Sequence, residues 1–439
     1  MKKKFTTSLG AVAMTLALVG LTACGSEKPT NQPKSEGPVT VDFWYSVSGQ
    51  PADTLVALVD EFNASQDATK VNAIFQGNYA DTMAKLTNAV QSGGLPPLLQ
   101  GGDTFTSYLK DTGLSVSPTE VKNSKGETFD PETLVPYLRD YYTIDDQLRS
   151  VPIMASQPVV FYNPEILARA GVSTDSPASL PDLFANAAAI HESTSTPGVT
   201  FQLNEWFSEV FSAGIGVDYC LVDNGLGAEP ASSFNIASAP QVALWTEVQG
   251  LLDSGAMFNV GTDGAAAQTA FANGNAGMVI ASTGVIGNLT EAATFDFGIW
   301  PLPTSNSGGA VPGGSSVWLL QDGIDETQQQ AAADFVHFLA SQESQTKVFS
   351  ETGFLPSNSE ALTALLVEAE GTEKVVLDQL NASQSTTAAL GCHSGAMGEM
   401  RPGVRSALES ISGGTVPADA LQNAQEQANA ALEKYNSRL

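Results

Sequence analysis

Histidine and cysteine have the widest chemical range of the residues in this 439-residue chain, and their spacing points away from catalysis. No two of the three histidines, His191, His337 and His393, are close in sequence. The sequence has no HExxH pair, no P-loop and no GxGxxG segment after a predicted strand. Paired carboxylates arise by chance among 47 acidic residues and carry no weight. We therefore expect no enzyme, no cofactor and no bound metal.

The first cysteine, Cys24, ends a leader with a chemistry of its own. A basic start is followed by uncharged, mostly apolar residues, and Leu21-Thr22-Ala23 leads into the cysteine. This order predicts a lipoprotein signal peptide over residues 1–23, cut before an acylated Cys24; an uncleaved membrane anchor is the alternative. The next residues carry no hydrophobic side chain, so residues 24–38 are predicted to be a disordered tether. We expect an extracytoplasmic protein held on the cell membrane by lipid.

The other two cysteines, Cys220 and Cys392, have no zinc-binding spacing. Outside the cytoplasm such a pair is permitted to form a disulfide, and the sequence leaves a bridge and two free thiols equally open.

The formal net charge of −28 limits the class of partner. Nucleic acids and anionic lipid surfaces would be repelled, so we expect neither to bind. Small ligands are not excluded, because salt screens the bulk field beyond about 8–10 Å.

Strands and helices alternate from the first folded residue, which predicts an α/β fold. The hydrophobic pattern predicts strand, helix, strand, helix and strand in turn over residues 39–100, and this order implies a mostly parallel sheet covered on both faces. Further strands are expected at 158–162, 278–281, 297–300 and 317–320. From residue 325 the pattern is chiefly helical, with helices expected at 331–349, 359–379 and 418–435.

A chain of this length is too long for one ordinary core and predicts two lobes. We expect residues 39–154 and 284–314 in the first lobe and residues 155–283 and 315–439 in the second, with the last helices packing on both. The expected crossings between lobes are rich in Gly, Ser or Pro: Ile153–Pro158, Ala281–Gly284 and Gly313–Val317. Two lobes joined in this way can close on a solute from both sides.

Several short stretches resemble one known family, from about residue 39 to the C-terminus. They are Phe43–Ser46, Phe62–Ala64, Gln76–Tyr79, Phe161–Asn163, Gly313–Trp318 and Thr352–Pro356. In this order they are similar to the extracellular solute-binding proteins that include the maltose-binding proteins, and more closely to the glycerol-3-phosphate-binding proteins of ABC importers. The resemblance implies a class II periplasmic-binding-protein fold, a ligand cleft between two lobes and a permease partner in the membrane. We expect a monomer that captures a phosphate-containing small molecule.

The same resemblance implies a set of ligand-binding positions. They are Tyr79, Asp103, Ser156, Trp206, Ser282, Gly314 and Arg405. Asp103 would accept hydrogen bonds from glycerol hydroxyls, Gly314 would offer a backbone N–H, and Arg405 would bind the phosphate. These residue types also suit a phosphate ligand independently of the resemblance. The planar guanidinium of arginine can bind two phosphate oxygens at once, and an aromatic wall excludes water.

The sequence departs from the glycerol-3-phosphate binders at three ligand-binding positions, two of them additional to this set. Phe354 replaces a tyrosine, Leu203 replaces a second tryptophan, and the acid is Asp103 and not the longer Glu. Fewer donors suit a phosphate of lower charge, and a lost indole widens the pocket. The ligand implied is a glycerophosphodiester, such as glycerophosphocholine, before sn-glycerol-3-phosphate itself.

Each position also has a structural explanation. Tyr79 could cap a helix, Asp103 could be a solvated loop acid, and Arg405 could pair with Glu409 on an exposed helix face. Ser156, Ser282 and Gly314 could serve hinge geometry, and Trp206 and Phe354 could belong to the core. The main functional alternative is a carbohydrate-binding member of the same family. An anchored hydrolase and a purely structural lipoprotein are weaker ones.

Overall fold

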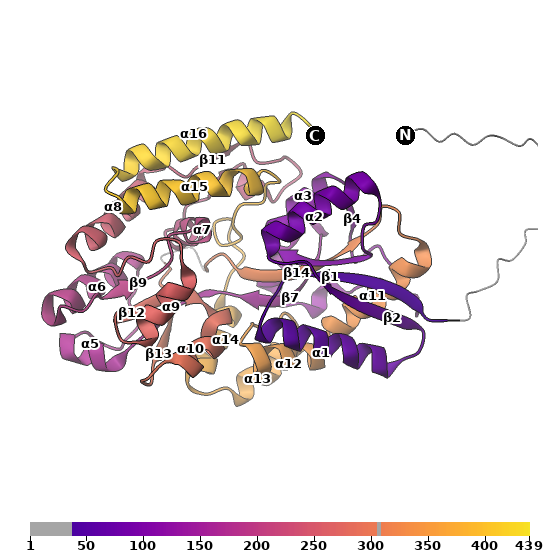
Figure 1. The fold of residues 1–439 in the computed structure, drawn as a ribbon, viewed down its shortest axis with the longest axis horizontal. Coiled ribbons are helices and arrows are strands. Elements are labelled where there is room, and N and C mark those ends of the chain that lie inside the picture. The colour runs from indigo at the N-terminus through magenta and orange to yellow at the C-terminus, as the bar shows by residue number, and fades with distance from the viewer. Residues whose placement is uncertain (1–36, 305–308) are drawn as a thin grey trace, which may run out of the picture. The chain divides into compact units, whose positions relative to one another are not determined.

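In a computed structural model, which describes residues 37–304 and 309–439, the chain forms two mixed β-sheets with helices around them (Figure 1). The first sheet has the order β2-β1-β3-β14-β4, with β7 also paired to β14. Its strands are β1 (Val39–Tyr45), β2 (Thr69–Phe75), β3 (Leu98–Gly102), β4 (Ser115–Val116), β7 (Val151–Ser156) and β14 (Gly313–Leu320). The second sheet has the order β13-β8-β12-β9. Its strands are β8 (Pro158–Tyr162), β9 (Val199–Thr200), β12 (Met278–Ser282) and β13 (Gly298–Pro301).

The alternating start of the chain folds as its pattern predicts. In β1 the side chains of Val41 and Phe43 are fully buried while those of Thr40 and Asp42 are exposed, so the first half of this strand is covered on one face and not on the two faces predicted. β1 pairs in parallel with both β2 and β3. The helices between these strands are α1 (Gln50–Ser65) and α2 (Tyr79–Ser92). The parallel part of the prediction is confirmed, whereas β14 runs antiparallel to β3, β4 and β7.

The remaining helices follow the chain through both sheets. They are α3 (Phe105–Asp111), α4 (Pro136–Tyr141), α5 (Pro164–Ala170), α6 (Leu180–Thr194), α7 (Glu205–Gly214), α8 (Ala239–Ser254), α9 (Gly264–Ala272), α10 (Ile286–Ala292), α11 (Glu326–Leu339), α12 (Gln342–Thr352), α13 (Ser359–Glu368), α14 (Gly371–Ala382), α15 (Met397–Ser412) and α16 (Pro417–Asn436). Two small hairpins, β5 (Thr143–Ile144) with β6 (Gln147–Leu148) and β10 (Cys220–Leu221) with β11 (Ser233–Phe234), complete the strands. The long helices expected at 331–349 and 359–379 are each two helices in the structure.

The strand pairings differ from the lobe boundaries that the sequence predicts. The prediction places 284–314 in the first lobe, but β13 within that range pairs with β8 of the second sheet. It places 315–439 in the second lobe, but β14 pairs with β3 and β7 of the first. The reason is aromatic packing: the ring of Phe335 on α11 lies 5.5 Å from that of Phe43 and 5.0 Å from that of Phe62. These contacts hold the helix after β14 against the first sheet.

Three connections join the two sheets. The first is Gln157, between β7 and β8, and the second is the segment from β13 to β14. The third runs through α13, because α12 packs on α1 while α14 packs on β13. Ala281–Gly284 is not such a connection, since β12 before it and β13 after it both belong to the second sheet.

The two C-terminal helices, α15 and α16, contact helices that lie beside each of the two sheets. α15 and α16 lie side by side and pack on α7 and α8 (Figure 1). The hydroxyl of Tyr435 on α16 also donates to Oδ2 of Asp111 on α3, at 3.0 Å. None of the helices in the described ranges has both the length and the apolar character needed to cross a bilayer.

Candidate ligand-binding site

Three strands of the first sheet bring predicted site residues to one edge. Gly313 of β14 is paired with Ser156, the last residue of β7, and Ser315 is paired with Gly102, the last residue of β3. Asp103 follows Gly102 directly. The carboxyl ends of β3 and β7 therefore meet the start of β14, the kind of edge at which open α/β sheets bind their ligands.

Gly314 is required at this edge by its backbone. Its φ is +103°, and a Cβ atom there would collide with the carbonyl oxygen of Met154 on the paired strand. Only glycine fits such a close approach at a positive φ. Backbone geometry alone therefore explains why position 314 is a glycine. A ligand contact through the N–H of Gly314 would be an additional role.

Tyr79 lies over the end of β3. It is the first residue of α2, which begins with a capping box between Asn78 and Asp81. Its ring lies so close to Gly102 that a Cβ atom on the glycine would be 2.9 Å from the ring carbon Cδ2. Burial raises the pKa of Tyr79 to about 12. The hydroxyl is therefore protonated at neutral pH and can both donate and accept a hydrogen bond.

Trp206 of α7 reaches the same edge from the second sheet's side of the fold. A Cβ atom on Gly313 would lie 3.0 Å from Ser156 Oγ and 3.1 Å from Trp206 Cζ2. α7 begins behind Asn204, whose side chain accepts from the N–H of Phe207. Among the residues that the structure describes, the buried Nε1 of Trp206 has no hydrogen-bond partner. The indole therefore brings an apolar wall and an unused donor to Ser156 and Gly313.

Ser282 and Phe354 lie beside the first connection between the sheets. Ser282 Oγ accepts from the N–H of Gly284 at 3.1 Å, and a Cβ atom on Gly284 would be 3.0 Å from Phe354 Cζ. The N–H of Thr283 donates to the carbonyl of Gln157 at 2.8 Å, next to Ser156 in the chain. Both predicted residues are thus tied to the crossover that leads from β7 into β8.

Asp103 is held by Arg401, a cation that is not among the predicted site residues. Its Oδ2 accepts from the Tyr141 hydroxyl at 3.1 Å and from Nη2 of Arg401 at 3.2 Å. The same Nη2 lies 3.4 Å from Oε2 of Glu209 on α7. Asp103 is therefore not a solvated loop acid. A signal existed in the sequence, since Arg401 precedes Arg405 by four residues on one helix and Glu209 interrupts an apolar stretch.

Burial controls the ionisation of the groups around this cation. It raises the pKa of Glu209 to about 7, although Arg401 and the N–H of Cys392 act in the opposite direction. It lowers the pKa of His393 to about 4, so this imidazole is neutral at pH 7. The His393 ring packs on that of Tyr141 with centroids 4.9 Å apart.

Arg405, the predicted phosphate ligand, already has a carboxylate partner. Its Nε lies 2.9 Å from Oε2 of Glu205 and its Nη2 lies 2.6 Å from Oε1, which is a two-toothed ion pair. The Arg405 side chain is 47% exposed and that of Glu205 is 12% exposed. Because Glu205 directly precedes Trp206, the guanidinium lies near the start of α7. The carboxylate partner of Arg405 is thus Glu205 and not Glu409, the partner expected if Arg405 lay on an exposed helix face.

Leu203 lies in the hydrophobic core. It is 1% exposed within the hydrophobic core, and its N–H donates to the carbonyl of Gly261 at 2.7 Å. The lost tryptophan at this position therefore changes core packing in the structure.

Cys220 and Cys392 form a disulfide with their Cα atoms 5.6 Å apart, so of the two alternatives the structure has the bridge. Both residues are buried. The bridge joins β10 to the segment before α15, where the N–H of Cys392 donates to Oε1 of Glu209 at 2.7 Å. Cys24 and the leader lie outside the described residues.

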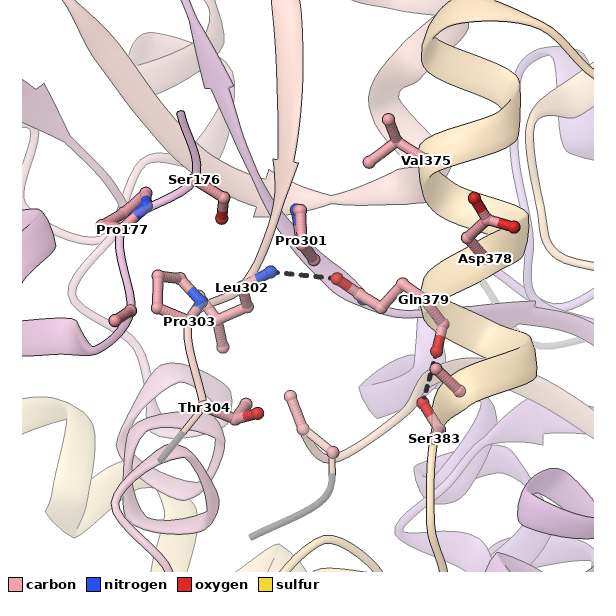
Figure 2. Close-up of a pocket in the computed structure, with 14 residues that line it drawn as sticks. Ser176, Pro177, Pro301, Leu302, Pro303, Thr304, Val375, Asp378, Gln379 and Ser383 are labelled. Carbon is pink, nitrogen blue, oxygen red and sulfur yellow. Dashed lines mark hydrogen bonds between the residues drawn. The ribbon is translucent and has the colours of Figure 1, made fainter. Parts of the chain in front are cut away.

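A large cavity lies elsewhere, beside α14. Its volume is about 580 Å³, and prolines 177, 301 and 303 contribute to its wall (Figure 2). Gln379 extends into it and accepts from the N–H of Leu302 at 2.9 Å. Asp378 is the single ionisable side chain among its described lining residues, and it pairs with Lys374. Because the one ionisable side chain among the described lining residues is an acid, this cavity is a poor place for a phosphate.

Comparisons with known proteins agree with this architecture. The sequence profile of a family described as bacterial extracellular solute-binding protein matches residues 57–374. The sn-glycerol-3-phosphate-binding periplasmic protein UgpB of Rhizobium meliloti is 28% identical over 331 residues, which cover 74% of this chain and 76% of the relative.

Two solved structures share the fold. The GacH receptor of Streptomyces glaucescens, studied unliganded and with acarbose, has a TM-score of 0.75 at 20% identity and covers 91% of this chain and 100% of its own. UgpB of Mycobacterium tuberculosis in complex with glycerophosphocholine has a TM-score of 0.72 at 19% identity, with the same coverage. The fold is thus the two-lobed α/β fold of periplasmic binding proteins. The chain belongs to the family of bacterial extracellular solute-binding proteins, which capture ligands for ABC importers outside the cytoplasm and are not enzymes.

Proposed function

We propose that this protein binds a glycerophosphodiester, such as glycerophosphocholine, or sn-glycerol-3-phosphate, and delivers it to an ABC permease. The observation that carries the proposal is the convergence of Tyr79, Ser156 and Trp206 on the edge formed by β3, β7 and β14. Hydroxyl groups, a glycine backbone and an indole at one place suit a small polar ligand with a carbon skeleton. Relatives named for sn-glycerol-3-phosphate binding support the ligand class.

A phosphate with a single negative charge asks less of the charged groups near this edge than a doubly charged one. Arg405 would meet the phosphate, and Asp103 would accept hydrogen bonds from the glycerol hydroxyls. Arg405 is shared with Glu205, so part of its charge is already compensated. A diester has one ionisable oxygen fewer than a monoester and asks less of such a site. Phe354, without a hydroxyl donor, points to the same preference.

A carbohydrate is the second candidate, and the ion pairs favour it. Both arginines near the edge are paired to carboxylates in the structure, Arg401 to Asp103 and Glu209 and Arg405 to Glu205. Carboxylates held by arginines are good acceptors for sugar hydroxyls. The likeness in fold to a receptor studied with acarbose is compatible with this candidate.

The leader sequence supports a location at the outer face of the cell membrane. We propose that Cys24 is acylated and that residues 24–38 tether the folded part to the cell membrane as a monomer. Two or more acyl chains give stable anchoring, because each buried CH₂ contributes roughly 0.8 kcal/mol.

A thermal unfolding panel tests the proposed ligand. At one hundred times its dissociation constant, glycerophosphocholine should add about 2.7 kcal/mol to the free energy of unfolding. sn-Glycerol-3-phosphate should stabilise the protein less at the same concentration, and maltose should leave the unfolding midpoint unchanged. A shift with maltose and none with either glycerol phosphate would replace the proposal by the carbohydrate alternative.

A further inference from the structure

Arg401 connects an acid at the edge of the first sheet with an acid on a helix beside the second. Asp103 follows β3, Glu209 lies on α7, and the guanidinium lies between them. The side chains of Asp103, Arg401 and Glu209 are 15%, 17% and 2% exposed. Glu209 is therefore buried, and Asp103 and Arg401 are partly buried. Charges withdrawn from water are stable when they are paired and hydrogen-bonded, so loss of one member leaves its neighbours poorly compensated.

The Asp103 carboxylate is held through one of its two oxygens. Tyr141 and Arg401 both donate to Oδ2. No hydrogen bond from any residue in the described ranges reaches Oδ1. An ionised carboxylate can accept about four hydrogen bonds, so Oδ1 retains its full capacity. The two donors therefore fix the direction of the group and leave one oxygen for another molecule.

Arg401 is itself held in place from behind. Glu209 accepts from Nη2 of Arg401 through Oε2 and from the N–H of Cys392 through Oε1. The disulfide anchors Cys392 to Cys220. A cavity of about 10 Å³ between Asp103, Arg401 and His393 is the size of one water molecule. The buried Nε of Arg401, which has no partner among the described residues, is a donor that such a water could satisfy.

We propose that Arg401 is a positioning residue of the ligand site, which orients Asp103 so that Oδ1 accepts a hydrogen bond from a ligand hydroxyl. The inference rests on the proposed role of Asp103 as a ligand acceptor. It does not depend on the phosphate, because a glycerol hydroxyl and a sugar hydroxyl make the same bond. Arg401 acts through Asp103 and has no ligand contact of its own in this scheme.

A double-mutant cycle tests the proposal. Dissociation constants are measured by titration calorimetry for the wild type, Arg401→Lys, Asp103→Asn and the double variant, with glycerophosphocholine and with maltose as separate probes. Arg401→Lys keeps the charge but loses the planar fork. It should weaken binding about ten- to a hundredfold, the usual range for a hydrogen bond to a charged group. In the Asp103→Asn background the same change should have almost no further effect, because the oriented group is already gone.

Two more variants keep the test decisive if Arg401→Lys folds poorly. Tyr141→Phe removes only the second donor to Oδ2, and it should show the same dependence on Asp103 with a smaller loss. Arg139→Lys is the matched control, because Arg139 also pairs with two carboxylates, Glu132 and Asp140, and neither of them belongs to the Asp103–Arg401–Glu209 set. It should leave the dissociation constant unchanged.

The outcomes separate this inference from the proposed ligand. Equal losses in the wild-type and Asp103→Asn backgrounds, or no loss at all, would overturn the positioning role. If maltose binds and glycerophosphocholine does not, a non-additive cycle with maltose supports Arg401 while the phosphate proposal fails. A wild-type protein that binds neither probe contradicts both.

Discussion

Replacing Arg405 by alanine is expected to abolish measurable binding of a micromolar glycerophosphodiester while the fold stays intact. Truncating one side of a charge-assisted pair typically costs about 2–5 kcal/mol, which is roughly thirty- to several-thousandfold in the dissociation constant. The structure adds a second reason. Glu205 would lose its two-toothed partner, and its largely buried carboxylate would then repel a phosphate near Trp206.

Variants of the same ion pair provide the controls for this result. Arg405→Lys should recover only part of the affinity, because a point charge cannot reproduce the two-toothed contact. Glu205→Gln should bind the diester at least as tightly as the wild type, because it releases the guanidinium from its carboxylate. The double variant Glu205→Gln/Arg405→Ala should bind better than Arg405→Ala alone. Calorimetry that finds Arg405→Ala equal to the wild type would remove the cation from the phosphate site.

The second large effect is expected from loss of the disulfide. Changing Cys220 and Cys392 together to alanine should lower the free energy of unfolding by about 2–4 kcal/mol. The bridge closes a sequence separation of 172 residues, so its removal frees a long loop in the unfolded chain. It also releases the segment whose N–H binds Glu209. The measurement is urea unfolding in a Cys24→Ala background, where these two cysteines are the only ones.

Chemical reduction offers an independent check of the disulfide prediction. Wild-type protein in a reducing agent strong enough to open buried disulfides should shift to the unfolding midpoint of the alanine variant. The alanine variant itself should not respond to the reductant. Identical midpoints for oxidised wild type and the double variant would show that the bridge contributes nothing to stability.

The sequence predicts local structure here better than the assignment of strands to sheets. The alternation in β1 and the helical spacing of Leu55, Leu58 and Phe62 follow from periodicity and are seen in the structure. The partners of β13 and β14 do not follow from it. A buried strand has the same hydrophobic pattern in either sheet, so its sequence does not identify its partners. The pairing depends on contacts between distant residues, such as Phe335 on Phe43.

The candidate site shows the same division. The resemblance names Asp103 and Ser156 as site residues, and both lie at strand ends, where open α/β sheets bind their ligands. The partners of Arg401 and Arg405 could not be predicted, because Glu209 and Glu205 lie on α7, 192 and 200 residues away in sequence, and Asp103 lies 298 residues away. The two arginines are four positions apart on α15, yet Arg401 is partly buried between two acids and Arg405 is half exposed. Helix periodicity cannot decide between them without the packing of α7.

Phosphorus NMR of glycerophosphocholine tests the central claim most directly, because it observes the phosphate itself. Purified protein is added to the ligand, and a large excess of maltose is then added to the same sample. We expect the phosphorus line to broaden and shift as protein is added, and to stay broadened and shifted when maltose is present. A line that does not change with protein, or that returns to its free position when maltose is added, would contradict this claim.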